Sequence, residues 1–89
     1  MNEVPQDDLT DGSLLGAVDL GSNSFHLIIA RIEHGEIRPT QALTEKVQLA
    51  AGLGEDRRLS GEAIERGLEC LRRFAQLLKS VEPERLRVV

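Results

Sequence analysis

The chain has 89 residues, which is enough for at most one small domain. Its only aromatic residues are two Phe, which excludes a stacking surface for single-stranded nucleic acid, and its single cysteine excludes an internal disulfide and a cysteine zinc site. The formal net charge of −4 arises from residues 1–13, which hold four acidic residues and no basic residue. The remainder is neutral, so any affinity for anions must be local.

The first 13 residues form a separate region in this interpretation. They are polar, carry Pro5 and Gly12 and show no hydrophobic periodicity, so we predict a disordered leader at 1–13 and a folded part at 14–89. No basic segment followed by an apolar run begins the chain, and no apolar stretch approaches the roughly 20 residues of a membrane-spanning helix. These features, with the lone cysteine, predict a cytoplasmic protein without stable membrane insertion.

Three strands are predicted in the first half of the folded part. Residues 14–20 and 24–33 read as strands, and the second alternates with apolar residues on both faces, which is typical of a sheet covered on both sides. Residues 37–45 read as a third strand, and Pro39 places it at an edge or at a bulge. Three consecutive antiparallel strands form a meander.

A long helix is predicted from Ser60, a good N-cap, to Val81. Pairs Glu62–Arg66 and Glu69–Arg73 have the favourable i,i+4 order. The face predicted to pack on the sheet consists of the apolar positions Ile64, Leu68, Leu71, Phe74, Ala75, Leu78 and Val81.

Another strand begins near residue 85, after Pro83 bars the helix from continuing. A strand that follows a crossover helix usually lies parallel to an earlier strand. The chain stops within this strand, which indicates the front of a larger domain; a complete small β-β-β-α-β domain is the alternative.

The turn between the first two strands carries the strongest functional signal. Gly21 permits close approach of backbone N–H groups, while Ser22, Asn23 and Ser24 add hydroxyl and amide donors, which together suit a phosphate. Asp19 precedes the turn, and a carboxylate beside a phosphate is expected to bind a hydrated divalent cation. An ordinary hairpin turn, with Asp19 capping local N–H groups, is the alternative interpretation.

Three other residues are predicted to have structural roles. His26 is expected to be a packed sheet histidine, and Cys70 a small buried hydrophobe at the helix face. Gly67 inside the helix is explained by a close approach of the helix to the sheet.

Three segments also resemble the exopolyphosphatase and guanosine pentaphosphate phosphohydrolase (Ppx/GppA) family. They are AVDLGSNSFH at 17–26, KVQLAAGL at 46–53 and ERGLECL at 65–71, and the similarity extends over about residues 15–89. The order of elements resembles the opening β-β-β-α-β portion of the actin, Hsp70 and sugar kinase (ribonuclease H-like) fold, an α/β class, incomplete at the C-terminus.

The resemblance implies a function for the complete protein. It implies hydrolysis of terminal phosphoanhydride bonds of inorganic polyphosphate or guanosine pentaphosphate, with Mg²⁺, in a cytoplasmic homodimer that binds no nucleic acid. Asp19 would lie beside the metal, Gly21, Ser22, Asn23 and Ser24 would form the first phosphate loop, and Lys46 would face the phosphates. The general base is expected beyond Val89, so no catalytic residue is assigned within this chain and the chain alone is expected to be inactive. These residues do not indicate which of the two substrates the protein uses.

Two alternatives to this function stay open. One is a fragment that binds phosphate or nucleotide without catalysis, because only half of a phosphate site is present. The other is a kinase of the same superfamily, which would transfer phosphate from a nucleotide to an acceptor instead of to water.

Overall fold

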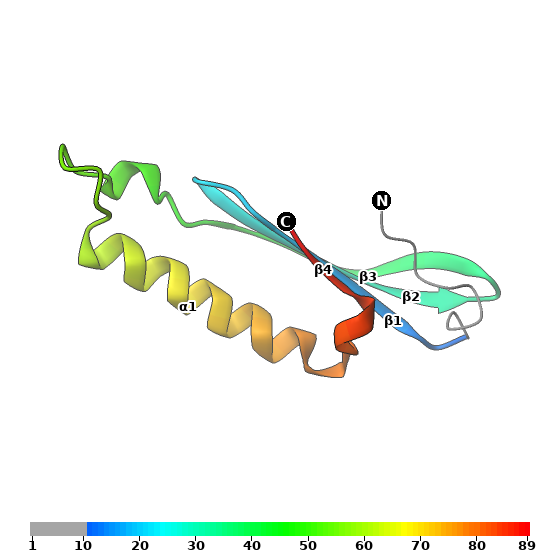
Figure 1. Ribbon diagram of the computed structural model, residues 1–89. Helices are drawn as coiled ribbons and strands as arrows, with labels where there is room; N and C mark the ends of the chain where they lie inside the picture. Colours follow the sequence, from blue (N-terminus) through cyan, green and yellow to red (C-terminus); the bar gives the residue numbers. More distant parts are fainter. Residues whose placement is uncertain (1–10) are drawn as a thin grey trace.

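A computed structural model describes residues 11–89 and contains a mixed four-stranded sheet with one long helix (Figure 1). Strands β1 (Leu14–Leu20), β2 (Ser24–Glu33) and β3 (Glu36–Lys46) form the predicted antiparallel meander. Helix α1 (Gly61–Leu77) crosses over to strand β4 (Leu86–Val88), which pairs parallel to β1. The strand order is β3-β2-β1-β4, so β3 is an edge strand as predicted.

The predicted bulge lies beside Pro39. Ile29 pairs with Gln41 whereas Ala30 pairs with Pro39, so Thr40 is the extra residue on β3. Its hydroxyl donates to the Ile29 carbonyl at 3.2 Å. A proline cannot donate a ladder hydrogen bond, and the bulge at an edge strand accommodates this.

Helix α1 begins where the sequence predicted and ends earlier. The Ser60 side chain accepts a hydrogen bond from the Ala63 N–H at 3.1 Å, which confirms the N-cap. The α-helix ends at Leu77, and a 3₁₀ turn, η3 (Leu78–Ser80), replaces the predicted last turn. A second 3₁₀ turn, η4 (Pro83–Arg85), leads directly into β4.

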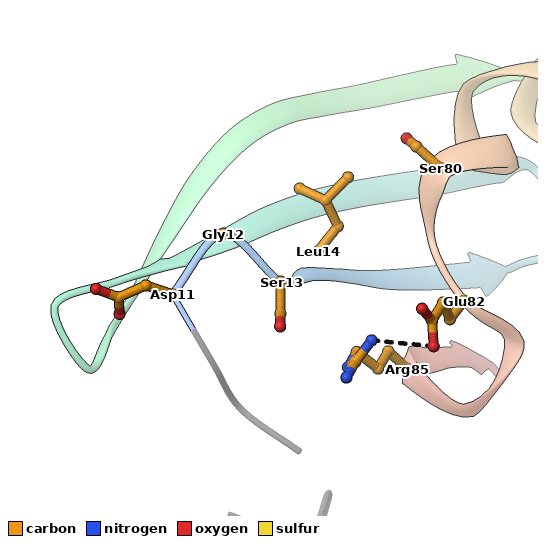
Figure 2. Close-up of a pocket in the computed structure, with 7 residues that line it drawn as sticks. All are labelled: Asp11, Gly12, Ser13, Leu14, Ser80, Glu82 and Arg85. Carbon is orange, nitrogen blue, oxygen red and sulfur yellow. Dashed lines mark ion pairs between the residues drawn. The ribbon is translucent and has the colours of Figure 1, made fainter. Parts of the chain in front are cut away.

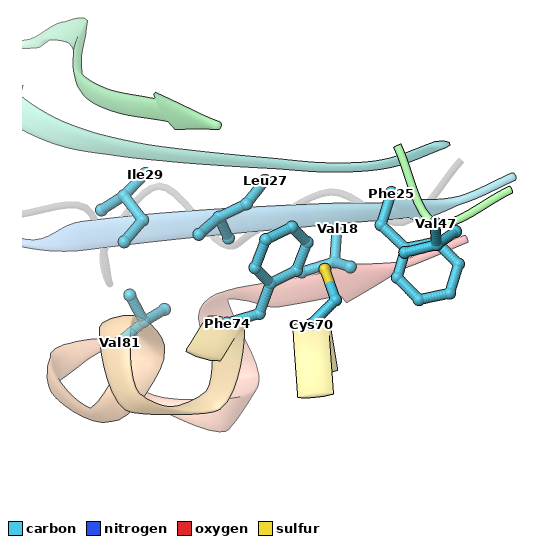
Figure 3. Close-up of a cluster of buried hydrophobic side chains, with 8 residues drawn as sticks. All are labelled: Val18, Phe25, Leu27, Ile29, Val47, Cys70, Phe74 and Val81. Carbon is cyan, nitrogen blue, oxygen red and sulfur yellow. The ribbon is translucent and has the colours of Figure 1, made fainter. Parts of the chain in front are cut away.

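The core lies between α1 and one face of the sheet (Figure 3). Leu27 is fully buried there, and Phe74 is 2% exposed. The remaining members of this cluster are Val18, Phe25, Ile29, Val47, Cys70 and Val81. A single apolar layer therefore joins β1, β2, the residue that follows β3 and the helix.

The predicted helix face is correct at Phe74 and Val81, which are buried, and is displaced by one residue in the first half of the helix. The buried residues of α1 are Ala63, Gly67, Cys70 and Phe74, whereas Ile64, Leu68 and Leu71 are exposed. Ala63, Gly67 and Cys70 allow the helix to approach the sheet and the loop after β3; a Cβ on Gly67 would lie only 3.5 Å from Leu49 and 3.9 Å from Phe25. Gly67 thus packs against the loop and β2, but at ordinary contact distances that would also accommodate a Cβ.

The second face of the sheet is open around the middle of β2 in residues 11–89. Ala30 and Ile32 are buried, but Ile28 is 47% exposed and His26 is exposed. The prediction of a packed histidine is therefore wrong: His26 Nδ1 lies 3.0 Å from the Thr44 hydroxyl on the open face. Helix α1 covers one face only (Figure 1), which is why the apolar alternation of β2 overestimated burial.

The start of the described chain runs beside β2. The Gly12 N–H donates to Ile32 O at 2.8 Å, and the Ile32 N–H donates to Ser13 O at 2.9 Å. Gly12 and Ser13 of the leader predicted at 1–13 therefore hydrogen-bond to β2, whereas residues 1–10 of it lie outside the described residues. None of the helices in residues 11–89 has the length and apolar character needed to cross a bilayer.

A hollow of about 400 Å³ lies at this end of the sheet (Figure 2). It is bordered by the start of β1 and by the η3–η4 region, where Arg85 and Glu82 form an ion pair at 3.2 Å. It contains none of the predicted phosphate-binding residues, which lie beyond the other end of β1.

Candidate functional site

The turn from Gly21 to Ser24 joins β1 to β2 and closes on itself. The Gly21 N–H donates to the Ser24 carbonyl at 3.0 Å. A Cβ on Gly21 would lie 3.0 Å from that same carbonyl oxygen, so a larger residue would push the turn open. The glycine is therefore favoured by a close backbone approach; its φ is not positive, in contrast to Gly12 and Gly35.

The segment that follows β3 supports this turn through backbone hydrogen bonds. The Gln48 N–H donates to Asn23 O at 2.9 Å, and the Leu49 N–H donates to Ser22 O at 2.9 Å. The Ala50 N–H also approaches Ser22 O, at 3.3 Å. Two sequence segments that resemble the same family, one at the turn and one after β3, thus meet in space.

These contacts orient the N–H groups of the turn. The described residues contain no cis peptide bond, so each carbonyl points opposite to the N–H of the same peptide plane. Because Ser22 O and Asn23 O point toward the segment after β3, the N–H groups of Asn23 and Ser24 face the other way. Adjacent N–H groups facing one side form a concavity that suits an anion.

A hollow of about 410 Å³ adjoins the turn. Three of the predicted phosphate-binding residues, Asn23, Ser24 and Lys46, line it together. Lys46 reaches this position because it is the register partner of Ser24 on the neighbouring strand. Gln48 and Ala51 complete the lining.

The structure separates Asp19 from this hollow. Asp19 is exposed, and it lines a different hollow on the open face of the sheet together with His26 and Arg87. Among residues 11–89, no three histidine, cysteine, aspartate or glutamate side chains are grouped so that they could hold a metal ion. Within that range Asp19 can contribute one carboxylate, which is compatible with a hydrated Mg²⁺ whose other ligands are water and phosphate oxygens.

Gln48 and Arg66 are site residues that the sequence analysis did not single out. Gln48 has φ +51°, an uncommon conformation for a residue other than glycine. Arg66 was assigned to an ion pair with Glu62, but its guanidinium instead donates to Val47 O and Gln48 O, at 2.9 and 3.1 Å. The helical spacing gave no indication of this, because the partners lie in a loop that is distant in sequence.

Comparison with known proteins gives the family. Residues 28–89, more than half of the chain, match the Ppx/GppA phosphatase family. The chain belongs to that family. The matched range begins after the turn, so it includes Lys46 and Arg66 but not residues 19–24.

Solved structures of this family are similar in fold. A PPX-GPPA enzyme of Aquifex aeolicus is 28% identical over 85% of this chain, with a TM-score of 0.70, and a type II crystal structure of the Aquifex aeolicus Ppx/GppA phosphatase has a TM-score of 0.72 at 26% identity, also over 85% of this chain. An exopolyphosphatase from Cytophaga hutchinsonii is 28% identical over 86% of this chain, with a TM-score of 0.70. The chain spans about a quarter of the length of these proteins, 25% of the first two and 24% of the third. The sheet and helix thus correspond to the N-terminal portion of the actin-like fold of Ppx/GppA proteins.

Proposed function

We propose that the protein containing this chain hydrolyses terminal phosphoanhydride bonds of inorganic polyphosphate or guanosine pentaphosphate and releases orthophosphate. The observation that carries the proposal is the turn at residues 21–24, whose carbonyls are held by the segment after β3 so that the adjacent N–H groups of Asn23 and Ser24 face the other way. Lys46 lines a hollow beside the turn, together with Gln48 and Ala51 of that segment. Membership of a phosphatase family and the similarity to an exopolyphosphatase support it.

In this proposal the chain supplies binding and orientation. The N–H groups of Asn23 and Ser24 and the hydroxyls of Ser22 and Ser24 donate to the oxygens of the terminal phosphate. The Lys46 ammonium offsets part of the negative charge that spreads over the transferred group as water attacks phosphorus. No residue of this chain is assigned as the base that activates the water.

Asp19 is the residue of this chain proposed to hold Mg²⁺. It lies near the end of β1, one residue before the turn, and it is exposed on the open face of the sheet, so a hydrated cation can reach it. When bound, Mg²⁺ would neutralise charge on the phosphate oxygens. The expected contribution of Asp19 is one ligand, because Mg²⁺ in phosphate sites keeps several waters.

The Lys46 role is tested in the complete protein by phosphate release from sodium polyphosphate with Mg²⁺. Lys46→Met should raise KM about tenfold, because a charge-assisted hydrogen bond to phosphate is lost. Lys79→Met is the matched control, since Lys79 is exposed near the far end of α1. Equal KM values for the two variants would remove Lys46 from the site.

The Asp19 role needs a separate variant. Asp19→Asn should lower kcat at least about 100-fold at saturating polyphosphate, and higher Mg²⁺ should restore part of it. Glu55→Gln, at an exposed loop carboxylate, should leave kcat unchanged.

Binding of polyphosphate by the unaltered protein without any phosphate release would contradict hydrolysis and favour a non-catalytic binding protein.

A further inference from the structure

Arg66 lies outside the hollow that adjoins the turn, yet it is connected to the turn by hydrogen bonds. Its Nε donates to Val47 O at 2.9 Å and its Nη2 to Gln48 O at 3.1 Å. No carboxylate among residues 11–89 lies within ion-pair distance of Arg66, so the guanidinium is directed at these two carbonyls. A planar guanidinium can donate to two acceptors at once in a fixed geometry, which an ammonium cannot do.

The two carbonyls belong to the peptide planes on either side of the Gln48 Cα. The N–H groups of the same two planes are those of Gln48 and Leu49, and they donate to Asn23 O and Ser22 O. Each plane is therefore held at its oxygen by Arg66 and at its nitrogen by the turn. This double constraint accounts for the left-handed backbone of Gln48, which costs of order 1 kcal/mol and persists only where the surroundings impose it.

The hydrogen bonds continue through the turn in the same direction. Ser22 O and Asn23 O accept from the segment after β3, so the N–H groups of Asn23 and Ser24 lie on the opposite side. The peptide dipoles from Arg66 to the turn thus share one orientation, with a cation at one end and the N–H groups of Asn23 and Ser24 at the other. Aligned hydrogen bonds polarise one another, and the donors at the end of such a series favour an anion.

We propose that Arg66 is a positioning residue for the phosphate-binding turn and acts through the peptide planes on either side of Gln48. The inference rests on the proposed function for the identity of the ligand. Arg66 does not touch the phosphate in this proposal; it fixes the direction of the N–H groups that do.

The packing of α1 against the loop after β3 places Arg66 within reach of that loop. Gly67 is buried, and a Cβ there would lie 3.5 Å from the Leu49 side chain, so the helix passes close to the segment that Arg66 holds. The next residue back along the helix is Arg66, whose side chain then spans the short distance to Val47 O. The helix and the loop therefore form one support for the turn.

The test compares Arg66→Gln and Arg66→Lys with the control Arg72→Gln in the complete protein. Arg72 lies on the same helix and forms exposed ion pairs with Glu65 and Glu69, so its removal changes the same charge without changing the loop. Amide hydrogen exchange at Gln48 and Leu49 should accelerate about tenfold in Arg66→Gln and remain unchanged in Arg72→Gln. Exchange at the buried Leu27 should not change in any of the variants.

Binding provides the second readout, measured by titration calorimetry with inorganic pyrophosphate and by KM for polyphosphate. Arg66→Gln should raise the Kd for pyrophosphate and the KM for polyphosphate about tenfold each, while kcat falls less than threefold. Arg66→Lys should be intermediate, because it keeps the charge but cannot hold both carbonyls in the same geometry.

Three results would overturn the inference, and the third is distinguishable from the other two. If Arg66→Gln accelerates exchange at Gln48 and Leu49 but binds pyrophosphate as tightly as Arg72→Gln, or leaves that exchange unchanged, Arg66 does not position the turn for phosphate. If the unaltered protein binds neither pyrophosphate nor polyphosphate, the proposed function fails as well, and the positioning role fails with it.

Discussion

Asp19 and His26 lie opposite each other on β1 and β2, on the face of the sheet that α1 leaves open. Thr44 is the next residue in the same row, on β3, and its hydroxyl lies 3.0 Å from His26 Nδ1. A carboxylate, an imidazole and a hydroxyl therefore cross three strands side by side. Because all three are exposed, this row contributes little to the stability of the sheet.

The first prediction concerns that row. His26→Gln should change the free energy of unfolding by less than about 0.5 kcal/mol, since an exposed side chain with one exposed hydrogen bond is replaced by another polar residue. Asp19→Asn should have an effect of the same small size. Urea denaturation of the complete protein measures both, and a loss of 2 kcal/mol or more, the order of a buried-group effect, would show that this face is covered there.

The second prediction concerns the close contact between η2 (Ala50–Gly52) and the start of α1. A Cβ on Gly52 would lie 2.5 Å from Ala63 Cβ and 2.9 Å from Ser60 Oγ, so Gly52→Ala should destabilise the fold by about 1–3 kcal/mol. Gly61→Ala is the control, because nothing lies within 4 Å of a Cβ there. Gly61→Ala, in the first turn of the helix, should leave the free energy of unfolding unchanged or raise it by up to about 1 kcal/mol. Equal effects of the two substitutions in thermal unfolding would contradict the contact.

The third prediction concerns Phe74, one of the largest fully buried side chains. Phe74→Ala should lower the free energy of unfolding by about 3–5 kcal/mol, through lost burial and the cavity that remains. Phe74→Leu retains most of the volume and should cost less than half of that. Guanidinium denaturation of the two variants beside the parent protein provides the comparison, and similar values for both would mean that the site relaxes around the smaller side chain.

The fourth prediction concerns pH and Cys70. Burial, followed by the nearby Glu45 carboxylate, raises the pKa of the Cys70 thiol above its ordinary value of 9.0, and Arg73 opposes this shift. The folded protein therefore holds the thiol proton more tightly than the unfolded chain. The stabilisation is fully present below pH 9 and is lost as the pH rises through the folded-state pKa.

The measurement for Cys70 is urea denaturation between pH 7 and pH 10.5. The parent protein should lose stability above pH 9 more steeply than Cys70→Ala, in which the titrating group is absent. Parallel curves for the two proteins would show that the thiol does not contribute. A fast reaction of Cys70 with a thiol reagent at pH 7 would likewise contradict its burial.

The sequence predicted the strands, the N-cap and the meander because these depend on local signals. Each of these signals determines the structure of its own segment. They are the alternation over residues 24–33, Ser60 before the helix and Pro39 in an edge strand. The position of β4 followed from the rule that a strand after a crossover helix lies parallel to an earlier strand. The turn at residues 21–24 was also recognisable, since hydroxyls and an amide after glycine suit a phosphate.

The remaining features depend on which residues meet in space. The buried helix face could not be predicted from hydrophobicity, because small residues pack against the sheet and the loop after β3. The larger apolar residues Ile64, Leu68 and Leu71 are exposed instead. The role of Arg66 was missed because its acceptors are backbone carbonyls, which every sequence carries. His26 was assigned to a packed position because a strand pattern cannot show whether a second layer covers it.

The parallel pairing of β4 with β1 has a consequence for how the chain folds. The β1–β3 meander is made of contacts between neighbours in sequence, whereas Val18 pairs with Val88, which follows it by 70 residues (88 − 18). Closing such a long loop is slow compared with forming hairpins. During synthesis on the ribosome β1 is therefore expected to stay an unpaired edge until its last partner emerges, and an unpaired apolar edge is the part of a nascent sheet most prone to associate with other chains.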